Sequence, residues 1–162
     1  MKTFIIAALT ADGLIGKNSS HRSLNWRSKA DSDFFISKTR EAGIVVMGKN
    51  TFETMKRPMP DRVHIVYSHE AIDGVETTKA SPAELLADIK KRGFNEVAIC
   101  GGSSIYTLFM QANLVDTLYL TIEPQLFGSG VPLFTDELDT QLQLISTKQV
   151  NDTVLLEYNV VK

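Results

Sequence analysis

Two patterns of apolar residues alternate along the chain. Residues 4–9 are continuously apolar, as expected of a strand that is buried on both faces of a sheet. Other short apolar runs predict strands, whereas apolar residues spaced by three and four predict helices. Strands are predicted at 4–9, 44–47, 63–67, 97–100, 117–123, 142–148 and 153–161, and helices at 30–41, 51–55, 82–92 and 103–111.

The order of these elements predicts an α/β fold. Strands and helices alternate up to residue 123, which is typical of a mostly parallel sheet with helices on its faces. The last two strands follow each other without a helix, so we expect an antiparallel edge. Residues 12–25, rich in Gly, Asn, Ser and His, are predicted to form a long surface loop. No linker or repeat divides the chain, and a single domain over 1–162 is expected.

Local signals support two boundaries between these elements. Ser81 can cap the helix at 82–92, Pro82 suits its first position, and Glu84 completes a capping box. The prolines within residues 57–61 can continue neither a helix nor a strand, so this segment is predicted to be a turn.

Two turns between a predicted strand and a predicted helix can bind anions. In the first, Gly48 is followed by Lys49, Asn50 and Thr51, and about fifty residues later Gly101-Gly102-Ser103-Ser104 repeats the arrangement. A helix N-terminus presents unpaired N–H groups and a partial positive charge, which together attract phosphate. Two such turns favour a dinucleotide. Glycine is also common at strand ends for purely structural reasons. The G-x-G-x-x-G fingerprint of Rossmann dinucleotide-binding folds is missing.

Asp31 is the candidate acid. It falls in the first turn of the helix at 30–41, with Phe35 one turn further along the same face and Asp33 turned about 200° away toward water. An aromatic neighbour disfavours the charged form of a carboxyl group and raises its pKa, which suits proton donation. The alternative is structural, because Ser28 and Asp31 have the spacing of a capping box.

Composition narrows the classes of function. Of the 162 residues 43% are hydrophobic and 22% charged, and the formal net charge of −2 argues against nucleic-acid binding. Cys100 is the only cysteine, so an internal disulfide and a thiolate metal cluster are excluded. The three histidines lack metal-ligand spacing, and no metal site is expected. No run is long enough to cross a bilayer, and a cytoplasmic protein is expected. The histidines are His21, His64 and His69.

Taken together, these motifs resemble the dihydrofolate reductase family over nearly the whole chain. Trp26, Asp31 and Phe34-Phe35 resemble the family's tryptophan, acid and substrate-contacting helix. The other matching segments, in family order, are Val46-Met47-Gly48-Lys49-Asn50-Thr51-Phe52-Glu53, Arg57-Pro58-Met59-Pro60-Asp61-Arg62, Cys100-Gly101-Gly102-Ser103-Ser104-Ile105-Tyr106 and Leu118-Tyr119-Leu120-Thr121. The resemblance implies about eight strands, four flanking helices and a cis peptide between Gly101 and Gly102.

The resemblance also implies a reaction, in which hydride passes from C4 of NADPH to C6 of dihydrofolate while N5 gains a proton. Asp31 would act with Thr121 and a water near Trp26. The implied substrate contacts are Ile6, Ala7, Asp31, Ser32, Phe35, Met55, Arg62, Cys100, Tyr106 and Thr121, with Arg62 on the glutamate carboxylate. The implied cofactor contacts are Ala8, Ile15, Gly16, Gly48, Lys49, Asn50, Thr51, Ser68, His69, Lys79, Cys100, Gly101, Gly102, Ser103, Ser104, Ile105 and Tyr106.

Several departures leave the substrate open. Ser32 stands where the family has a large apolar residue, Ser103 replaces a glycine, and the loop before Trp26 is longer. Residues 127–134, with their Gly-Ser-Gly run, resemble instead the related reductase domain of riboflavin synthesis, whose substrate is a pyrimidine. A nucleotide-binding protein without catalysis is a third alternative. A monomer is expected, with a dimer left open.

Overall fold

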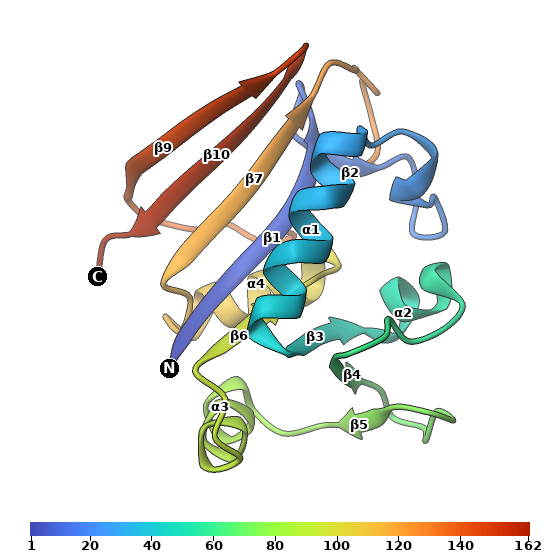
Figure 1. The fold of residues 1–162 in the computed structure, drawn as a ribbon, viewed down its shortest axis with the longest axis vertical. Helices are drawn as coiled ribbons and strands as arrows, with labels where there is room; N and C mark the ends of the chain where they lie inside the picture. Colours follow the sequence, from blue (N-terminus) through green and yellow to red (C-terminus); the bar gives the residue numbers. More distant parts are fainter.

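One twisted sheet of eight strands runs through the structure, a computed structural model that describes residues 1–162, with Leu24 described by its backbone alone (Figure 1). The strand order is β5-β4-β3-β6-β1-β7-β10-β9. Neighbours from β5 to β7 are parallel, and β10 and β9 add the antiparallel edge that the sequence predicts. The strands are β1 (Lys2–Thr10), β3 (Ile44–Gly48), β4 (Val63–Tyr67), β5 (Glu76–Thr78), β6 (Glu96–Ile99), β7 (Thr117–Glu123), β9 (Leu142–Val150) and β10 (Thr153–Val160).

Four α-helices lie on the two faces of the sheet, and each corresponds to a predicted helix. They are α1 (Lys29–Ala42), α2 (Lys49–Met55), α3 (Pro82–Lys91) and α4 (Ser103–Gln111). The capping box predicted for α3 is present, because Ser81 accepts the Glu84 N–H and Glu84 accepts the Ser81 N–H. No helix in the part of the chain that the structure describes is long and apolar enough to cross a membrane.

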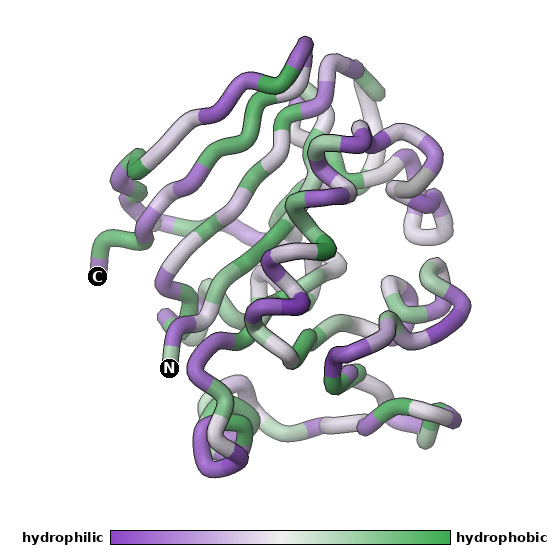
Figure 2. Tube along the Cα trace, in the orientation of Figure 1, coloured by the Kyte–Doolittle hydropathy of each residue, from purple (hydrophilic) through white to green (hydrophobic). Residues whose placement is uncertain are grey.

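The core has two layers, one on each face of the sheet. Along β1, Phe4 and Ile6 point into the layer beneath α1 and α2, whereas Ile5 and Ala7 point into the layer beneath α3 and α4. Residues 3–7 are all buried, and this is why the first strand is continuously apolar. Figure 2 shows the hydrophobic segments gathered along the central strands and the hydrophilic ones in the connecting loops.

The predicted surface loop at 12–25 is more ordered than expected. It contains β2 (Leu14–Gly16), which pairs with β8 (Val131–Pro132) in a separate two-stranded sheet, and a 3₁₀ turn at Ser23–Asn25. Strands of two and three residues are too short to show a period, and the pairing partner is more than a hundred residues away. At the contact, a Cβ on Gly130 would lie 2.3 Å from the carbonyl oxygen of Gly16, so only glycine fits there.

Candidate active site

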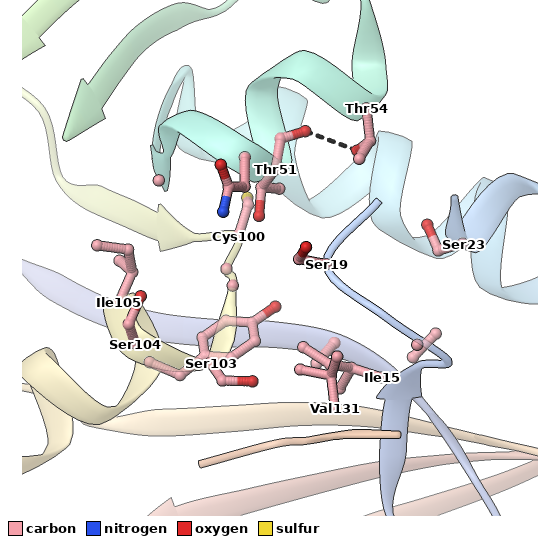
Figure 3. Close-up of a pocket in the computed structure, with 18 of the residues that line it drawn as sticks. Ile15, Ser19, Ser23, Thr51, Thr54, Cys100, Ser103, Ser104, Ile105 and Val131 are labelled. Atoms are coloured by element: carbon pink, nitrogen blue, oxygen red, sulfur yellow. Dashed lines mark hydrogen bonds between the residues drawn. The ribbon is translucent and has the colours of Figure 1, made fainter. Parts of the chain in front are cut away.

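The carboxyl ends of β1, β3 and β6 open into a cavity of about 470 Å³. Parallel strands end at the same edge of a sheet, where open α/β folds bind their ligands. Figure 3 shows Thr51 and Thr54 of α2 on one side of the cavity and Ile15 and Val131 of the small sheet across from them. The cavity therefore lies between the main sheet and the long loop after β1.

Two glycine turns form one wall of the cavity. The Gly48 N–H donates a hydrogen bond to the Gly101 carbonyl at 2.7 Å, which continues the ladder between β3 and β6. The peptide between Gly101 and Gly102 is cis, as the family resemblance implies. Gly101 has a φ of +105°, and a Cβ there would lie 3.0 Å from the Tyr106 hydroxyl. A side chain at position 101 is thus disfavoured by the backbone conformation, and it would also have to displace the Tyr106 ring.

The wall offers hydrogen-bond donors to a ligand. Helix α4 begins behind Gly102, with no side-chain cap among the described residues, so its first N–H groups face the cavity edge. Ser103 donates its hydroxyl to the Pro132 carbonyl and its own carbonyl accepts the Thr107 hydroxyl, which leaves the Ser103 backbone N–H for a ligand. The buried Tyr67 hydroxyl lines the cavity without a partner in the described structure. Burial raises the pKa of Tyr67 to about 12, so it is a neutral donor. These groups fit a phosphate-bearing cofactor.

Lys49 lies at the cavity rim, and its charge is already paired. Its Nζ is 3.0 Å from a Glu70 carboxylate oxygen, and the Glu70 hydrogen bond raises the pKa of Lys49. The Ser68 hydroxyl donates to the Glu70 carbonyl and accepts the Glu70 N–H. These two hydrogen bonds fix the turn that carries Glu70. Ser68, His69 and Lys79 do not line the cavity in the part of the chain that the structure describes. No sequence motif marks Glu70, because its contact is with Lys49, which lies 21 residues away in the chain.

Asp31 is buried at the cavity wall, with 3% of its surface exposed. Burial raises its pKa above the ordinary 3.8, and this rise is opposed by a hydrogen bond from Thr121 and by the charge of Arg27. The nearest guanidinium atom, Arg27 Nε, is 3.9 Å from the Asp31 carboxylate. Thr121 comes from β7, where it pairs in register with Ala8 of β1. Asp33 is exposed, as the sequence predicts.

The structural alternative for Asp31 holds only in part. The Ser28 hydroxyl accepts the Asp31 N–H at 3.1 Å, so Ser28 is indeed the cap of α1. The reciprocal half of a capping box is taken by another residue, because the Ser28 N–H donates to Glu123 at 2.9 Å. The Asp31 carboxylate is therefore left to the cavity, Thr121 and Arg27.

Five residues that the resemblance assigns to catalysis or to the substrate do not line the cavity in the described structure. Trp26 is buried with its ring 5.3 Å from that of Phe127, and Met55 packs in the core beneath α1. Trp26, Ser32, Met55, Arg62 and Thr121 are outside the set of described residues that line the cavity.

Arg62 ends the proline turn, and His64 fixes that turn. The imidazole Nε2 of His64 accepts the Met59 N–H at 3.1 Å, so its Nδ1 carries the proton and donates to the Arg62 carbonyl. Burial lowers the pKa of His64, which keeps the ring neutral.

The cavity brings together most of the predicted cofactor contacts and about half of the substrate contacts. Those that line it are Ile6, Ala7, Ala8, Ile15, Gly16, Asp31, Phe35, Gly48, Lys49, Asn50, Thr51, Cys100, Gly101, Gly102, Ser103, Ser104, Ile105 and Tyr106. Sequence reasoning missed Asn18, Ser19, His21, Ser23, Arg27, Thr54, Tyr67, Val131 and Thr135. Of these residues, only Arg27 could have been predicted from the sequence, because it lies between the predicted tryptophan and the predicted acid.

Comparisons with known proteins agree with this geometry. A family model described as dihydrofolate reductase matches residues 2–158. The chain is 36% identical over 130 residues to dihydrofolate reductase type 3 of Salmonella typhimurium, covering 76% of this chain and 74% of that one. A putative riboflavin biosynthesis protein from Shewanella sp. PV-4 has the same fold, with a TM-score of 0.85, 24% identity and 100% coverage of both chains. Dihydrofolate reductase from Enterococcus faecalis, solved with NADP(H) and RAB-propyl, has a TM-score of 0.74 at 27% identity, covering 99% and 97%.

Proposed function

The chain belongs to the dihydrofolate reductase family, and from that premise we propose that it reduces 7,8-dihydrofolate to 5,6,7,8-tetrahydrofolate with NADPH. The observation that carries the proposal is the Asp31 carboxyl group, which is buried at the cavity wall beside Thr121 and has a raised pKa. A protonated carboxyl group in such a place can donate a hydrogen bond or a proton to a ring nitrogen.

The two glycine turns are the proposed cofactor site. The N–H groups at the start of α4 and the Tyr67 hydroxyl would hold phosphate and ribose oxygens, and Lys49 would meet the 2′-phosphate. When bound, NADPH supplies the hydride that C6 of dihydrofolate receives. The structure solved from Enterococcus faecalis carries NADP(H), which supports the same cofactor for this chain.

Asp31 is the proposed acid for N5. Its carboxyl group would hold the pterin ring by hydrogen bonds and raise the supply of protons near N5, while Thr121 fixes its orientation. The charge of Arg27, 3.9 Å away, offsets part of the cost of ionising a buried carboxyl group, so Asp31 can cycle between its two forms.

A pyrimidine of riboflavin synthesis is the second candidate substrate. Arg62, the residue that would bind the glutamate tail of dihydrofolate, is outside the described lining of the cavity, whereas Arg27 is part of it. The solved structure named a putative riboflavin biosynthesis protein supports this alternative through fold alone.

One assay tests the proposed function. Purified protein is mixed with NADPH and dihydrofolate as the only acceptor, and loss of the nicotinamide absorbance is followed. Oxidation that depends on dihydrofolate is the expected result. Oxidation only with a ribosylaminopyrimidine acceptor would give the second candidate. Tight NADPH binding without oxidation by either acceptor would leave a nucleotide-binding protein.

A further inference from the structure

We propose that Glu123 is a positioning residue for Asp31: by taking the hydrogen bonds that the cap of α1 would otherwise offer to Asp31, it keeps the Asp31 carboxylate turned toward the cavity. The use of Asp31 as the acid rests on the proposed function. The positioning itself rests on the hydrogen bonds around Ser28 and can be tested without substrate.

Glu123 is a buried carboxylate whose oxygens are used for structure. Only 2% of its surface is exposed. One oxygen accepts the Ser28 N–H at 2.9 Å and the Ser28 hydroxyl at 2.8 Å, and the other accepts the Thr153 hydroxyl at 3.1 Å. A buried carboxylate is costly unless such partners are present, so this arrangement pins the start of α1 to the end of β7.

Helix α3 shows what the Asp31 carboxylate would do without Glu123. Its cap, Ser81, is followed three residues later by Glu84, and Glu84 turns back to accept both the N–H and the hydroxyl of Ser81. Helix α1 has the same spacing, with Ser28 and then Asp31. There Glu123, from a strand distant in sequence, occupies the place that the residue at the third helical position holds in α3.

The two groups of Ser28 thus determine where Asp31 points. With Glu123 present, the Ser28 hydroxyl donates to Glu123 and accepts the Asp31 N–H, so the backbone of Asp31 is fixed while its side chain is free of the cap. Without Glu123, the half-buried Ser28 N–H loses its acceptor, and the Asp31 carboxylate is the acceptor within the same helical turn.

Other charged and titratable groups around Asp31 bear on any pH measurement. Arg27 faces it from the segment before α1, and Glu123 faces it from β7. Tyr106 of α4 and Cys100 at the end of β6 line the same cavity, and burial raises the pKa of both. Of these four groups, only Glu123 is changed in the position-123 variants described below.

The test follows the Asp31 carboxyl group by carbon-13 NMR in the free protein, with Asp31→Asn to assign its signal. Glu123→Met keeps the volume and removes the acceptor. We expect the Ser28 amide proton to titrate together with Asp31 in this variant. Asp31 should titrate at lower pH than in wild type for two reasons: the negative charge of Glu123, which raises the Asp31 pKa, is gone, and the Asp31 carboxylate then accepts N–H groups at a helix N-terminus. Turnover should fall about tenfold or more.

Two further variants make the result decisive. Glu123→Gln also removes the charge but keeps an acceptor for Ser28, so its Asp31 titration gives the effect of the charge alone. It should leave the Ser28 amide silent and recover most of the turnover lost in Glu123→Met. Glu123→Asp shortens the side chain by one methylene and so draws the carboxylate back from Ser28. It should change the Ser28 amide and the Asp31 titration in the same direction as Glu123→Met but by less, and it replaces Glu123→Met as the test if that variant does not fold. Glu84→Ala is the control for loss of a cap far from the cavity and should leave the Asp31 titration as in wild type.

A Ser28 amide that stays silent in both Glu123→Met and Glu123→Asp, with Asp31 titrating in Glu123→Met as it does in Glu123→Gln, would overturn the proposal, whatever the turnover. If both change as expected but wild type fails to oxidise NADPH with dihydrofolate, the positioning stands and the proposed function falls.

Discussion

The backbone N–H of Gly48 and the carbonyl oxygen of Gly101 are joined by a hydrogen bond of 2.7 Å. This bond ties the turn before α2 to the turn before α4, although the two turns are about fifty residues apart in the chain. The two helix N-termini therefore approach a ligand from fixed positions. Such preorganisation lowers the entropic cost of binding a molecule with several phosphates.

Cofactor preference should depend on Lys49 and Glu70. Lys49→Ala should reduce the preference for NADPH over NADH by about tenfold or more, the usual effect of losing a charge-assisted bond to phosphate. Glu70→Gln frees Lys49 from its 3.0 Å ion pair, so it should strengthen NADPH binding and leave NADH binding nearly unchanged. Values of kcat/KM with both cofactors provide the measurement. Equal use of both cofactors by wild type would contradict the assignment of this phosphate site.

Asp31→Asn should slow turnover at neutral pH by about 10² to 10⁴, the range for loss of a general acid or base. The raised pKa of Asp31 means that wild-type turnover falls as pH rises through that pKa, because the acid form is lost. The variant should lack this limb, and its deficit should shrink at low pH, where solvent supplies the proton. If turnover of Asp31→Asn stays within about threefold of wild type across the pH range, Asp31 has a structural role and is not the acid.

The same substitution should stabilise the fold at neutral pH. Burial raises the pKa of Asp31 in the folded state above the ordinary 3.8, so the folded protein binds more protons than the unfolded chain between these values. By linkage, wild-type stability falls as pH rises through this window, and Asn carries no such cost. Urea unfolding should show Asp31→Asn to be more stable at pH 7, with the advantage absent below pH 3.8. A less stable variant at pH 7 would mean that Thr121 and Arg27 outweigh burial.

Arg62→Ala distinguishes the two candidate substrates. Loss of a charge-assisted pair with the glutamate carboxylate should raise KM for dihydrofolate about tenfold or more. Turnover at saturation should change less, since a contact far from the reacting carbon is mostly uniform binding. Initial rates over a range of dihydrofolate concentrations give both constants.

Lys29→Ala is the control for Arg62, because it removes a positive charge that is exposed and paired with Asp33. An unchanged dihydrofolate KM in Arg62→Ala would place the tail elsewhere and favour the pyrimidine substrate.

Gly130→Ala should open the small sheet beside the cavity. Its Cβ would lie 2.3 Å from the Gly16 carbonyl oxygen, a contact that backbone movement alone can relieve. We expect a loss of about 1–3 kcal/mol in the free energy of unfolding, the usual cost of overpacking. Gly128→Ala is the matched control, since nothing lies within 4 Å of its Cβ and only its φ of +73° is strained. Thermal unfolding should rank Gly130→Ala well below Gly128→Ala.

The parts of the fold that were predictable are those with a local period. The continuous apolar run of β1 and the Ser81-Pro82 start of α3 each carry their signal within a few residues. Helical spacing singled out Asp31 because Phe35 and Ser28 are its helical neighbours, but it left a capping role open, and the family resemblance was needed to favour the acid. The β2–β8 pair and the Glu70–Lys49 pair could not be found, since each depends on a residue brought close only by the completed sheet.

Asp31 and Glu123, the residue that we propose positions it, are made at very different times. Ser28 and Glu123 are separated by 95 residues, and Thr153 follows 30 residues later. Ribosomes add about 5–20 residues each second, so Ser28 is joined to the chain about 5–20 s before Glu123. During that interval Glu123 is not yet present to accept the Ser28 N–H. Asp31 is thus synthesised early, and the contacts that we propose to position its side chain form only when β7 docks beside β1, late in translation.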